Sequence, residues 1–236
     1  MNDSFSLIVP AYKEEDFIEN SLSGLLKAFR NENFDFEIIV IIDREPDDKT
    51  HEIVEKIATN SEEIKILARY GKRGIAKAVL DGINKASKNV IILVMGENSQ
   101  DPQEIVKMTY KIKEGYDMVF GSRFLNNQKL EKYPLTKYIA NRLCNYVIGL
   151  LFGIKSNDIT NGIKAYKSQI LKNMQITSTG FEIFVELPIN AYIHGYKNFV
   201  EIPIKYYGRD LSFSKFDLKK EAPRYIKVIL KYFLKL

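Results

Sequence analysis

Residues 5–15 read FSLIVPAYKEE, an apolar run that reaches a proline and then turns polar and acidic. Such a run is typical of a buried strand that opens into a loop, a place where α/β proteins often carry their chemistry. Acidic residues fill the first turn of the following segment, where they complement a helix dipole. Helical spacing continues in the apolar positions Phe17, Ile18, Leu22, Leu25, Leu26 and Phe29. The stretch therefore predicts a strand followed by an amphipathic helix.

Four more short apolar runs repeat this arrangement through the first half of the chain. They read EIIVII at 37–42, IKIL at 64–67, VIILV at 90–94 and DMVF at 117–120, with amphipathic stretches between them. Strands that alternate with helices indicate βαβ units and a mostly parallel sheet covered on both faces. The predicted fold class is α/β, a Rossmann-like sheet with flanking helices.

The second half predicts longer helices. One is expected from about Leu135 to Phe152, and another in FEIFVELPINAYIHGY at 181–196, where Pro188 should kink or split it. The segment NFVEIPIKYY at 198–207 predicts a late strand, with Pro203 marking an edge or a bulge.

Composition limits the class of protein. The chain has 236 residues and 45% hydrophobic content, which suits one domain with a sizeable core. Its single cysteine, Cys144, allows no internal disulfide, and no apolar signal segment precedes the first strand, so a cytoplasmic setting is expected. The longest nearly uncharged apolar run, about Leu143 to Ile154, falls short of the ~20 residues that span a bilayer, so no transmembrane helix is expected.

The net charge of +5 is concentrated in the last residues of the chain. A local basic segment argues against nucleic acid as a partner and for one anionic contact. Basic and apolar positions separate there by helical spacing, with Ile226, Ile229, Leu230 and Phe233 opposite Lys220, Arg224, Lys227, Lys231 and Lys235. This pattern predicts a basic amphipathic helix on an anionic membrane or a partner helix, against the alternative of an ordinary surface helix.

Polar motifs follow several predicted strands. The first strand ends in PAYKEE, the second in IIDREPDDKT around Asp43, and the fifth in GSRF at 121–124; DITNGIKAY follows at 158–166. In their order and spacing these motifs resemble glycosyltransferase family 2, with the GT-A fold. They are most similar to its dolichyl-phosphate and polyprenyl-phosphate sugar synthases. The resemblance extends from Phe5 to about Arg224.

The resemblance implies a nucleotide-sugar site in residues 1–124 and an acceptor site in residues 125–214 of a single domain, 1–236. The amphipathic terminal helix then occupies 215–236. Residues at the strand ends are expected to bind the nucleotide, with Asp43 in the base-binding role. They are Pro10, Ala11, Tyr12, Glu14, Asp43, Gly96 and Glu97.

The stretch VMGENSQDP at 94–102 raises the question of a metal. The family has Asp-x-Asp here, which binds a divalent cation, Mg or Mn, on the diphosphate. This chain has Gly96 and Asn98 at those positions and keeps Gln100, so Glu97 or Asp101 would have to supply a carboxylate. Three outcomes remain open: a weaker metal site, metal-independent catalysis with basic side chains at the diphosphate, or loss of transferase activity.

The resemblance also implies a basic acceptor site that holds phosphate. The expected catalytic residues are Arg123, Lys137, Arg209 and Lys215. The expected acceptor-binding residues are Arg123, Lys137, Asn141, Asn145 and Ser214. Glu182 and Glu186 are candidate bases for a hydroxyl acceptor, but their predicted role is structural.

The chemistry of the acceptor explains why a basic site suits it. A phosphate monoester has its second pKa near ~6, so it is already largely dianionic and needs positioning more than a general base. The leading hypothesis is therefore an inverting transfer of a sugar from a nucleotide-diphosphate sugar to a polyprenyl phosphate, of dolichyl or undecaprenyl type, at the cytoplasmic membrane face. The alternatives are transfer to a glycan hydroxyl and a non-catalytic nucleotide-sugar-binding or partner protein. A membrane-spanning subunit is a further possible partner.

Overall fold

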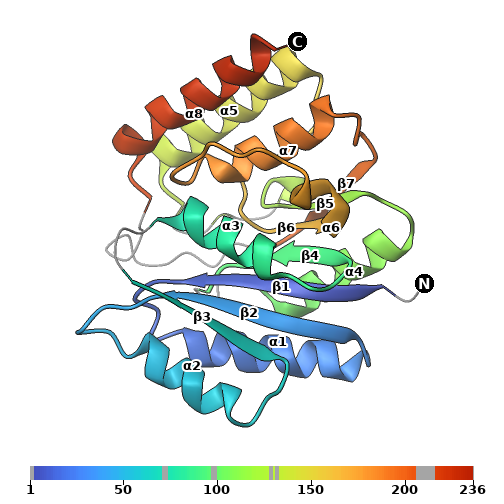
Figure 1. The fold of residues 1–236 in the computed structure, drawn as a ribbon. Helices are drawn as coiled ribbons and strands as arrows, with labels where there is room; N and C mark the ends of the chain where they lie inside the picture. The colour runs from blue at the N-terminus through green and yellow to red at the C-terminus, as the bar shows by residue number, and fades with distance from the viewer. Residues whose placement is uncertain are drawn as a thin grey trace.

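The computed structural model describes residues 3–70, 74–96, 100–127, 130, 133–205 and 216–235. Within them, one sheet of seven strands runs in the order β3-β2-β1-β4-β6-β5-β7 (Figure 1). Neighbouring strands are parallel, except that β6 is antiparallel to both β4 and β5. The strands are β1 (Ser4–Ala11), β2 (Asp35–Asp43), β3 (Ile64–Arg69), β4 (Val90–Leu93), β5 (Met118–Ser122), β6 (Lys164–Lys167) and β7 (Phe199–Pro203).

Helices cover both faces of this sheet, which confirms the predicted α/β class. They are α1 (Ile18–Asn31), α2 (Thr50–Ala58), α3 (Ile75–Lys85), α4 (Pro102–Lys113), α5 (Leu135–Phe152), α6 (Ser168–Lys172), α7 (Ile183–Ile193) and α8 (Leu218–Phe233), with a 3₁₀ turn η1 at Leu125–Asn127. In Figure 1, α1 and α2 lie below the sheet, whereas α3 and α7 lie above it.

Strand β2 shows how the pleat fills two cores. Successive side chains of a strand point to opposite faces. Ile38, Val40 and Ile42 therefore pack with α1, α2 and α4, while Ile39 and Ile41 pack with α3. All five are buried, which is why the sequence shows a continuous apolar run without alternation.

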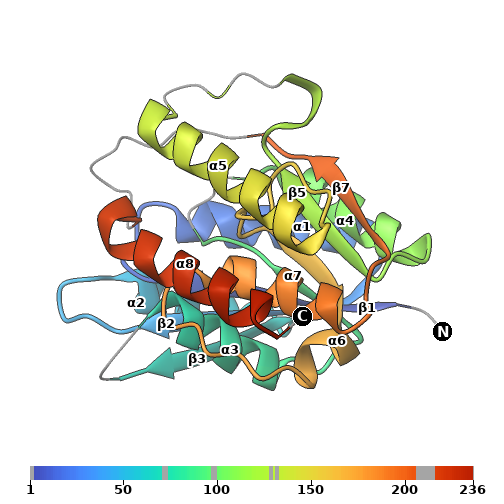
Figure 2. The same ribbon diagram turned by 90° about the horizontal axis from the view of Figure 1, so that it is seen from above.

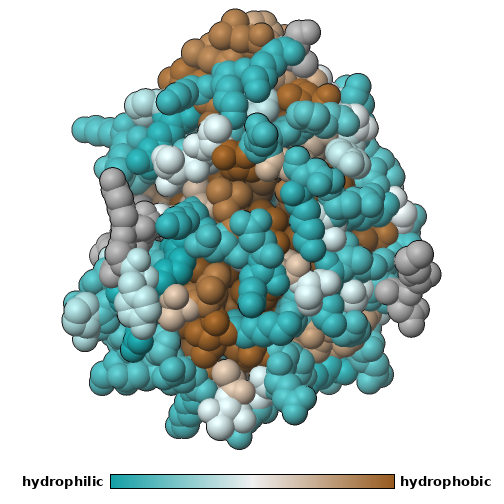
Figure 3. All heavy atoms as spheres, in the orientation of Figure 1, coloured by the Kyte–Doolittle hydropathy of each residue, from teal (hydrophilic) through white to brown (hydrophobic). Residues whose placement is uncertain are grey.

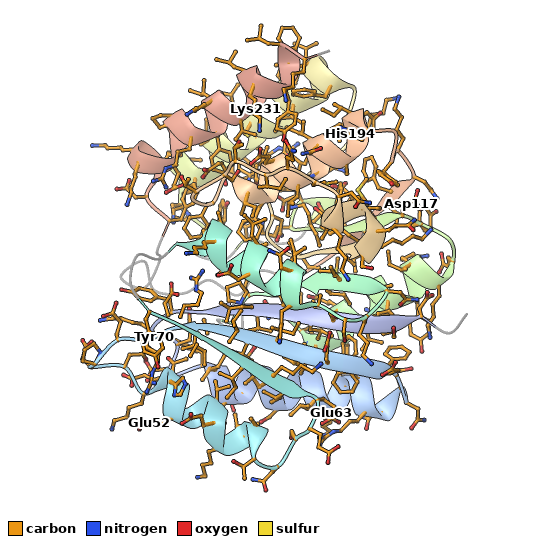
Figure 4. All side chains as sticks on the ribbon, in the orientation of Figure 1. Glu52, Glu63, Tyr70, Asp117, His194 and Lys231 are labelled. Atoms are coloured by element: carbon orange, nitrogen blue, oxygen red, sulfur yellow. The ribbon has the colours of Figure 1, made fainter. Side chains whose placement is uncertain are left out.

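A third apolar cluster joins α5, α7 and α8 above the sheet. Helix α5 ends at Gly153, whose φ of 72° is the left-handed conformation that glycine adopts readily. Figure 2 shows α5 and α8 side by side along one surface of the molecule. Lys231 of α8 donates to Glu186 of α7 at 2.8 Å, and Figure 4 places Lys231 between these two helices.

Pro188 lies inside α7, which continues through it with its flanking residues buried on both sides, so the helix is not split there. Ile229, predicted on the apolar face of the terminal helix with Ile226, is buried in the third cluster, whereas Ile226 is exposed. Lys231, predicted on the basic face of that helix, pairs with Glu186 of α7. Other expectations were confirmed: α5 covers the predicted residues, and Pro203 ends β7, an edge strand.

No helix within the described ranges combines the length and the hydrophobicity that crossing a membrane requires.

Candidate active site

A cleft of about 1030 Å³ opens at the carboxyl ends of the parallel strands. Residues from both halves of the chain line it, including Ala11 at the end of β1, Asp43 of β2, Arg69 of β3, Gly96 after β4 and Arg123 after β5. In an open α/β sheet these strand ends are where ligands bind, because the loops there converge.

Asp43 and Arg69 form a nearly buried ion pair at the first end of the cleft. Arg69 Nε and Nη2 lie 2.6 and 2.5 Å from Asp43 Oδ1, and both side chains are less than a tenth exposed. Arg69 also donates to the carbonyl of Gly74, 3.3 Å away, at the start of α3. The family motifs did not identify Arg69. Its signal was its place at the end of β3, beside the end of β2.

The turn after β1 is fixed to the loop after β2. The Glu14 amide donates to Thr50 Oγ1 at 2.9 Å, and Tyr12 donates to Glu45 at 3.3 Å. Lys13 adopts a φ of 51° at this turn and pairs with Asp47. Pro10, Ala11, Tyr12 and Glu14 line the same cleft as Asp43.

Gly96 lines the cleft and lies close to the end of β1. A Cβ atom at this position would lie 2.9 Å from the carbonyl oxygen of Pro10, nearer than real Cβ atoms approach backbone. The position where the family has its first metal-binding aspartate therefore has no room for a side chain in this backbone.

In the predicted metal segment, Gln100 and Asp101 make hydrogen bonds that stabilise the local backbone. Gln100 is buried and donates from its amide to the Met95 carbonyl at 2.8 Å. Asp101 caps α4 by accepting from the Gln103 amide at 2.9 Å. Glu97 and Asn98 lie outside the described residues. Within the described ranges, no group of three or more His, Cys, Asp or Glu side chains is placed to hold a metal ion.

Arg123 and Asp158 dominate the second end of the cleft. Arg123 Nε and Nη2 donate to the two oxygens of Asp158 at 2.7 and 2.8 Å, and the Arg123 amide adds a third bond at 3.0 Å. Burial would raise the pKa of Asp158, but attraction and hydrogen bonds from Arg123 outweigh it and lower that pKa. Arg123 also donates to Tyr133 at 3.4 Å.

Lys164 lies fully buried behind this pair, a feature the motifs did not single out as functional. Its ammonium donates to the carbonyl of Asn161 and sits 5.7 Å from the ring centroid of Phe120. Burial lowers its pKa to about 7, although the charge of Asp158 opposes the shift. Lys164 is thus a buried lysine near enough to Asp158 and Arg123 for their charges to act on its pKa.

The other predicted acceptor residues divide into three groups. Lys137 and Asn141 of α5 line the cleft, and Lys137 Nζ lies 5.6 Å from the ring centroid of Phe216. Asn145 is buried, and its Oδ1 accepts a hydrogen bond from the Ile159 amide at 2.6 Å. In the structure this side chain therefore fixes the backbone at Ile159. Arg209, Ser214 and Lys215 lie outside the described residues.

Glu182 and Glu186 hold backbone, in line with the structural role predicted for them. Glu182 accepts from the amides of Thr179 and Gly180 at 2.7 and 3.1 Å. Burial would raise the pKa of Glu186, but hydrogen bonds from Lys231 and from the 177–178 turn lower it to about 2.

Apolar residues continue the cleft between α5 and α8. Leu143 and Val147 of α5 line it, as do Ile226 and Ile229 of α8. The cleft therefore changes from polar at the strand ends to apolar between these two helices.

Comparison with known proteins supplies a family match and two kinds of similarity. The model of a family described as glycosyl transferase family 2 matches residues 6–174. A dolichol-phosphate mannosyltransferase of Pyrococcus furiosus is 26% identical over 189 residues, covering 79% of this chain and 52% of that protein. A polyprenol monophosphomannose synthase of Mycolicibacterium smegmatis is 24% identical over 216 residues, covering 89% and 79%. This chain thus spans about half the length of the Pyrococcus protein.

Among solved structures, a glucosyl-3-phosphoglycerate synthase from Mycobacterium tuberculosis is similar in fold. It was crystallised with Mn²⁺, uridine diphosphate and phosphoglyceric acid. The TM-score is 0.75 at 14% identity, covering 98% of this chain and 78% of the other.

Proposed function

Because the chain belongs to glycosyl transferase family 2, we propose that it transfers a sugar from a nucleotide-diphosphate sugar to a polyprenyl phosphate with inversion. One observation carries this proposal: a single cleft joins the Asp43–Arg69 pair to the Arg123–Asp158 pair and then becomes apolar between α5 and α8. Such a cleft suits a nucleotide, a phosphate and a hydrocarbon chain in that order.

At the first end, Pro10, Ala11, Tyr12 and Glu14 would enclose the nucleoside, and Gly96 would let its ribose or diphosphate come close to the backbone. Asp43 has the hydrogen-bond acceptors for a base or ribose. The Arg69 contact fixes the rotamer of Asp43, so this acceptor is oriented before a ligand arrives.

At the second end, Arg123 and Lys137 would hold the acceptor phosphate beside the anomeric carbon. A phosphate oxygen attacks that carbon, the bond to the diphosphate oxygen breaks, and the nucleoside diphosphate leaves with the electron pair. No proton has to be removed from a dianionic phosphate, so a general base is unnecessary. Arg209, Ser214 and Lys215 are proposed to complete this phosphate site, with Asn141 and Asn145 in support.

A divalent cation, Mg or Mn, remains part of the proposal through Glu97 and Asn98 with the substrate's own phosphate oxygens. Support comes from the Mn²⁺ bound in the Mycobacterium tuberculosis structure. When bound, the ion would offset the charge of the departing diphosphate.

The proposed site of action is the cytoplasmic membrane face, where polyprenyl phosphates are embedded. The basic helix α8 supports peripheral contact with an anionic surface or with a membrane-spanning subunit. The named relatives that act on dolichol and polyprenol phosphates support the acceptor class.

Product analysis tests the proposal directly. The chain is incubated with UDP-, GDP- and other nucleotide sugars and with a prenyl phosphate, a prenyl alcohol or a glycan, with and without Mg²⁺ or Mn²⁺. The proposal expects a sugar phosphodiester from the prenyl phosphate alone. A product from a glycan hydroxyl would contradict the phosphate acceptor, and nucleotide binding without any product would indicate a non-catalytic binding protein.

A further inference from the structure

Helix α5 carries a continuous stripe of exposed apolar side chains. Leu135, Ile139, Leu143, Tyr146 and Leu150 recur at steps of four, four, three and four, which places them on one face. Each is between 57% and 71% exposed. Single exposed apolar residues are ordinary, but an uninterrupted row along an 18-residue helix marks an interaction surface.

Helix α8 extends this stripe. Ile226, Leu230 and Phe233 recur at steps of four and three and are between 43% and 57% exposed. Figure 2 shows α8 beside α5, and Figure 3 shows apolar surface gathered at the top, over the ends of these two helices. Together, these five exposed residues of α5 and three exposed residues of α8 form the α5–α8 face.

The charged side chains of α5 and α8 beside the α5–α8 face are mostly basic, and the exposed acidic exception is Asp217, the N-cap of α8. The sequence of α5, LTKYIANRLCNYVIGLLF, contains two basic residues and no acidic one. Lys219, Lys220 and Lys227 of α8 are exposed, while its acidic Glu221 is buried and paired with Arg224. Helices that combine large apolar and aromatic side chains with flanking lysine and arginine bind in the interface of an anionic bilayer.

The cleft opens onto this face. Leu143 and Ile226 line the cleft and are also 60% and 57% exposed. They therefore stand where the apolar part of the cleft meets the surface.

We propose that the α5–α8 face docks flat on an anionic lipid bilayer and sets the apolar mouth of the cleft at the lipid surface. Helix α5 supplies most of the inserted side chains, and the lysines of α8 meet the anionic headgroups. The proposal rests on the proposed function for the identity of the acceptor, whereas docking itself requires no acceptor.

A lipid surface fits this face better than a second copy of the chain. A symmetric dimer through the face would bring identical basic flanks together, and like charges at close range oppose association. Anionic headgroups instead neutralise those flanks.

Flotation of the full chain with vesicles tests the proposal. The double variant Ile139→Glu/Leu150→Glu changes two stripe residues that do not line the cleft. The matched control is Asn60→Glu/Gln103→Glu, with two exposed positions outside the face. Wild type and control should float with vesicles of phosphatidylcholine and phosphatidylglycerol, and the stripe variant should bind on the order of tenfold more weakly. Wild type, control and stripe variant should all bind more weakly to vesicles of phosphatidylcholine alone than to the anionic vesicles.

Two further measurements separate docking from folding and from catalysis. Thermal unfolding and turnover of a short, water-soluble prenyl phosphate should be unchanged in the stripe variant. Equal vesicle binding by stripe variant and wild type overturns the proposal, as does a wild type that never binds anionic vesicles. A wild-type dimer that the stripe variant dissociates assigns the face to a second copy instead. If neither wild type nor any variant turns over an acceptor, the proposed function is wrong. Flotation still tests membrane docking in that case, because it does not depend on turnover.

Discussion

Arg123 and Asp158 face each other through two parallel hydrogen bonds of 2.7 and 2.8 Å, with the carboxylate completely buried and the guanidinium at the edge of the cleft. The fork geometry of arginine makes this pair rigid as well as strong. Under the proposed function, Asp158 would act through Arg123, as a positioning residue that holds the guanidinium at the cleft.

The variant Asp158→Asn should lose both stability and acceptor binding. Removing one charge of a buried pair leaves the other uncompensated, so the free energy of unfolding should fall by about 3 kcal/mol. Because Arg123 is then no longer held, KM for the acceptor should rise while nucleotide binding stays. Urea unfolding and steady-state kinetics measure both effects, with the exposed Asp35→Asn as control. An unchanged acceptor KM in a folded Asp158→Asn protein would contradict the positioning role.

The variant Asp43→Asn should weaken binding of the nucleotide sugar. It removes a charged hydrogen-bond acceptor from the first subsite and loosens Arg69, so Kd should rise on the order of tenfold. Calorimetry measures this change, and KM for the acceptor should not move. Asp47→Asn is the matched control, because Asp47 is largely exposed and its pair with Lys13 is worth little. Equal Kd values for the Asp43→Asn and Asp47→Asn proteins would show that Asp43 does not bind the nucleotide sugar.

Restoring the family's aspartate at Gly96 should not create a strong metal site. A Cβ there meets the Pro10 carbonyl, so Gly96→Asp should destabilise the protein by about 1–3 kcal/mol through overpacking. Metal titration of activity and thermal unfolding provide the measurements. A stable Gly96→Asp protein with tighter Mn²⁺ dependence would show that this backbone adapts to a side chain.

Lys164 should make stability depend on pH. Its pKa is about 7 when folded, against an ordinary value of 10.5, so between these values the unfolded chain holds a proton that the folded chain lacks. Stability therefore rises with pH across this window, by about 1.4 kcal/mol per pH unit, and this dependence is absent below pH ~7. Urea unfolding of wild type and Lys164→Met from neutral to alkaline pH should give curves that diverge by this slope. Parallel curves would mean that Lys164 stays charged when folded.

The sequence predicted the elements that are long and apolar, and missed those that depend on neighbours. Strands β1, β2, β4 and β5 were predicted because both of their faces are buried, and the edge strand β3 was predicted from its short apolar run IKIL. Strand β6 was not, because KAYK lacks a continuous apolar run and becomes a strand by pairing with β4 and β5. Periodicity placed Ile229 with the exposed residues of α8, but only packing against α5 and α7 reveals which side is covered.

The same limit applies to the candidate site. Motif spacing identified Asp43 and Arg123, and the structure brings both to one cleft. Arg69 and Lys164 have no motif of their own. Their roles follow from contacts between distant segments, which one sequence does not display.

Acceptor kinetics of Arg123 variants test whether Arg123 holds the acceptor phosphate. Transfer to a short prenyl phosphate is measured for wild type, Arg123→Lys and Arg123→Met, together with nucleotide binding by calorimetry. Arg123→Met should raise the acceptor KM on the order of tenfold or more and leave the donor Kd unchanged. Arg123→Lys should fall between wild type and Arg123→Met, because lysine keeps the charge without the fork. An Arg123→Met protein with wild-type acceptor KM and full turnover would contradict this role of Arg123.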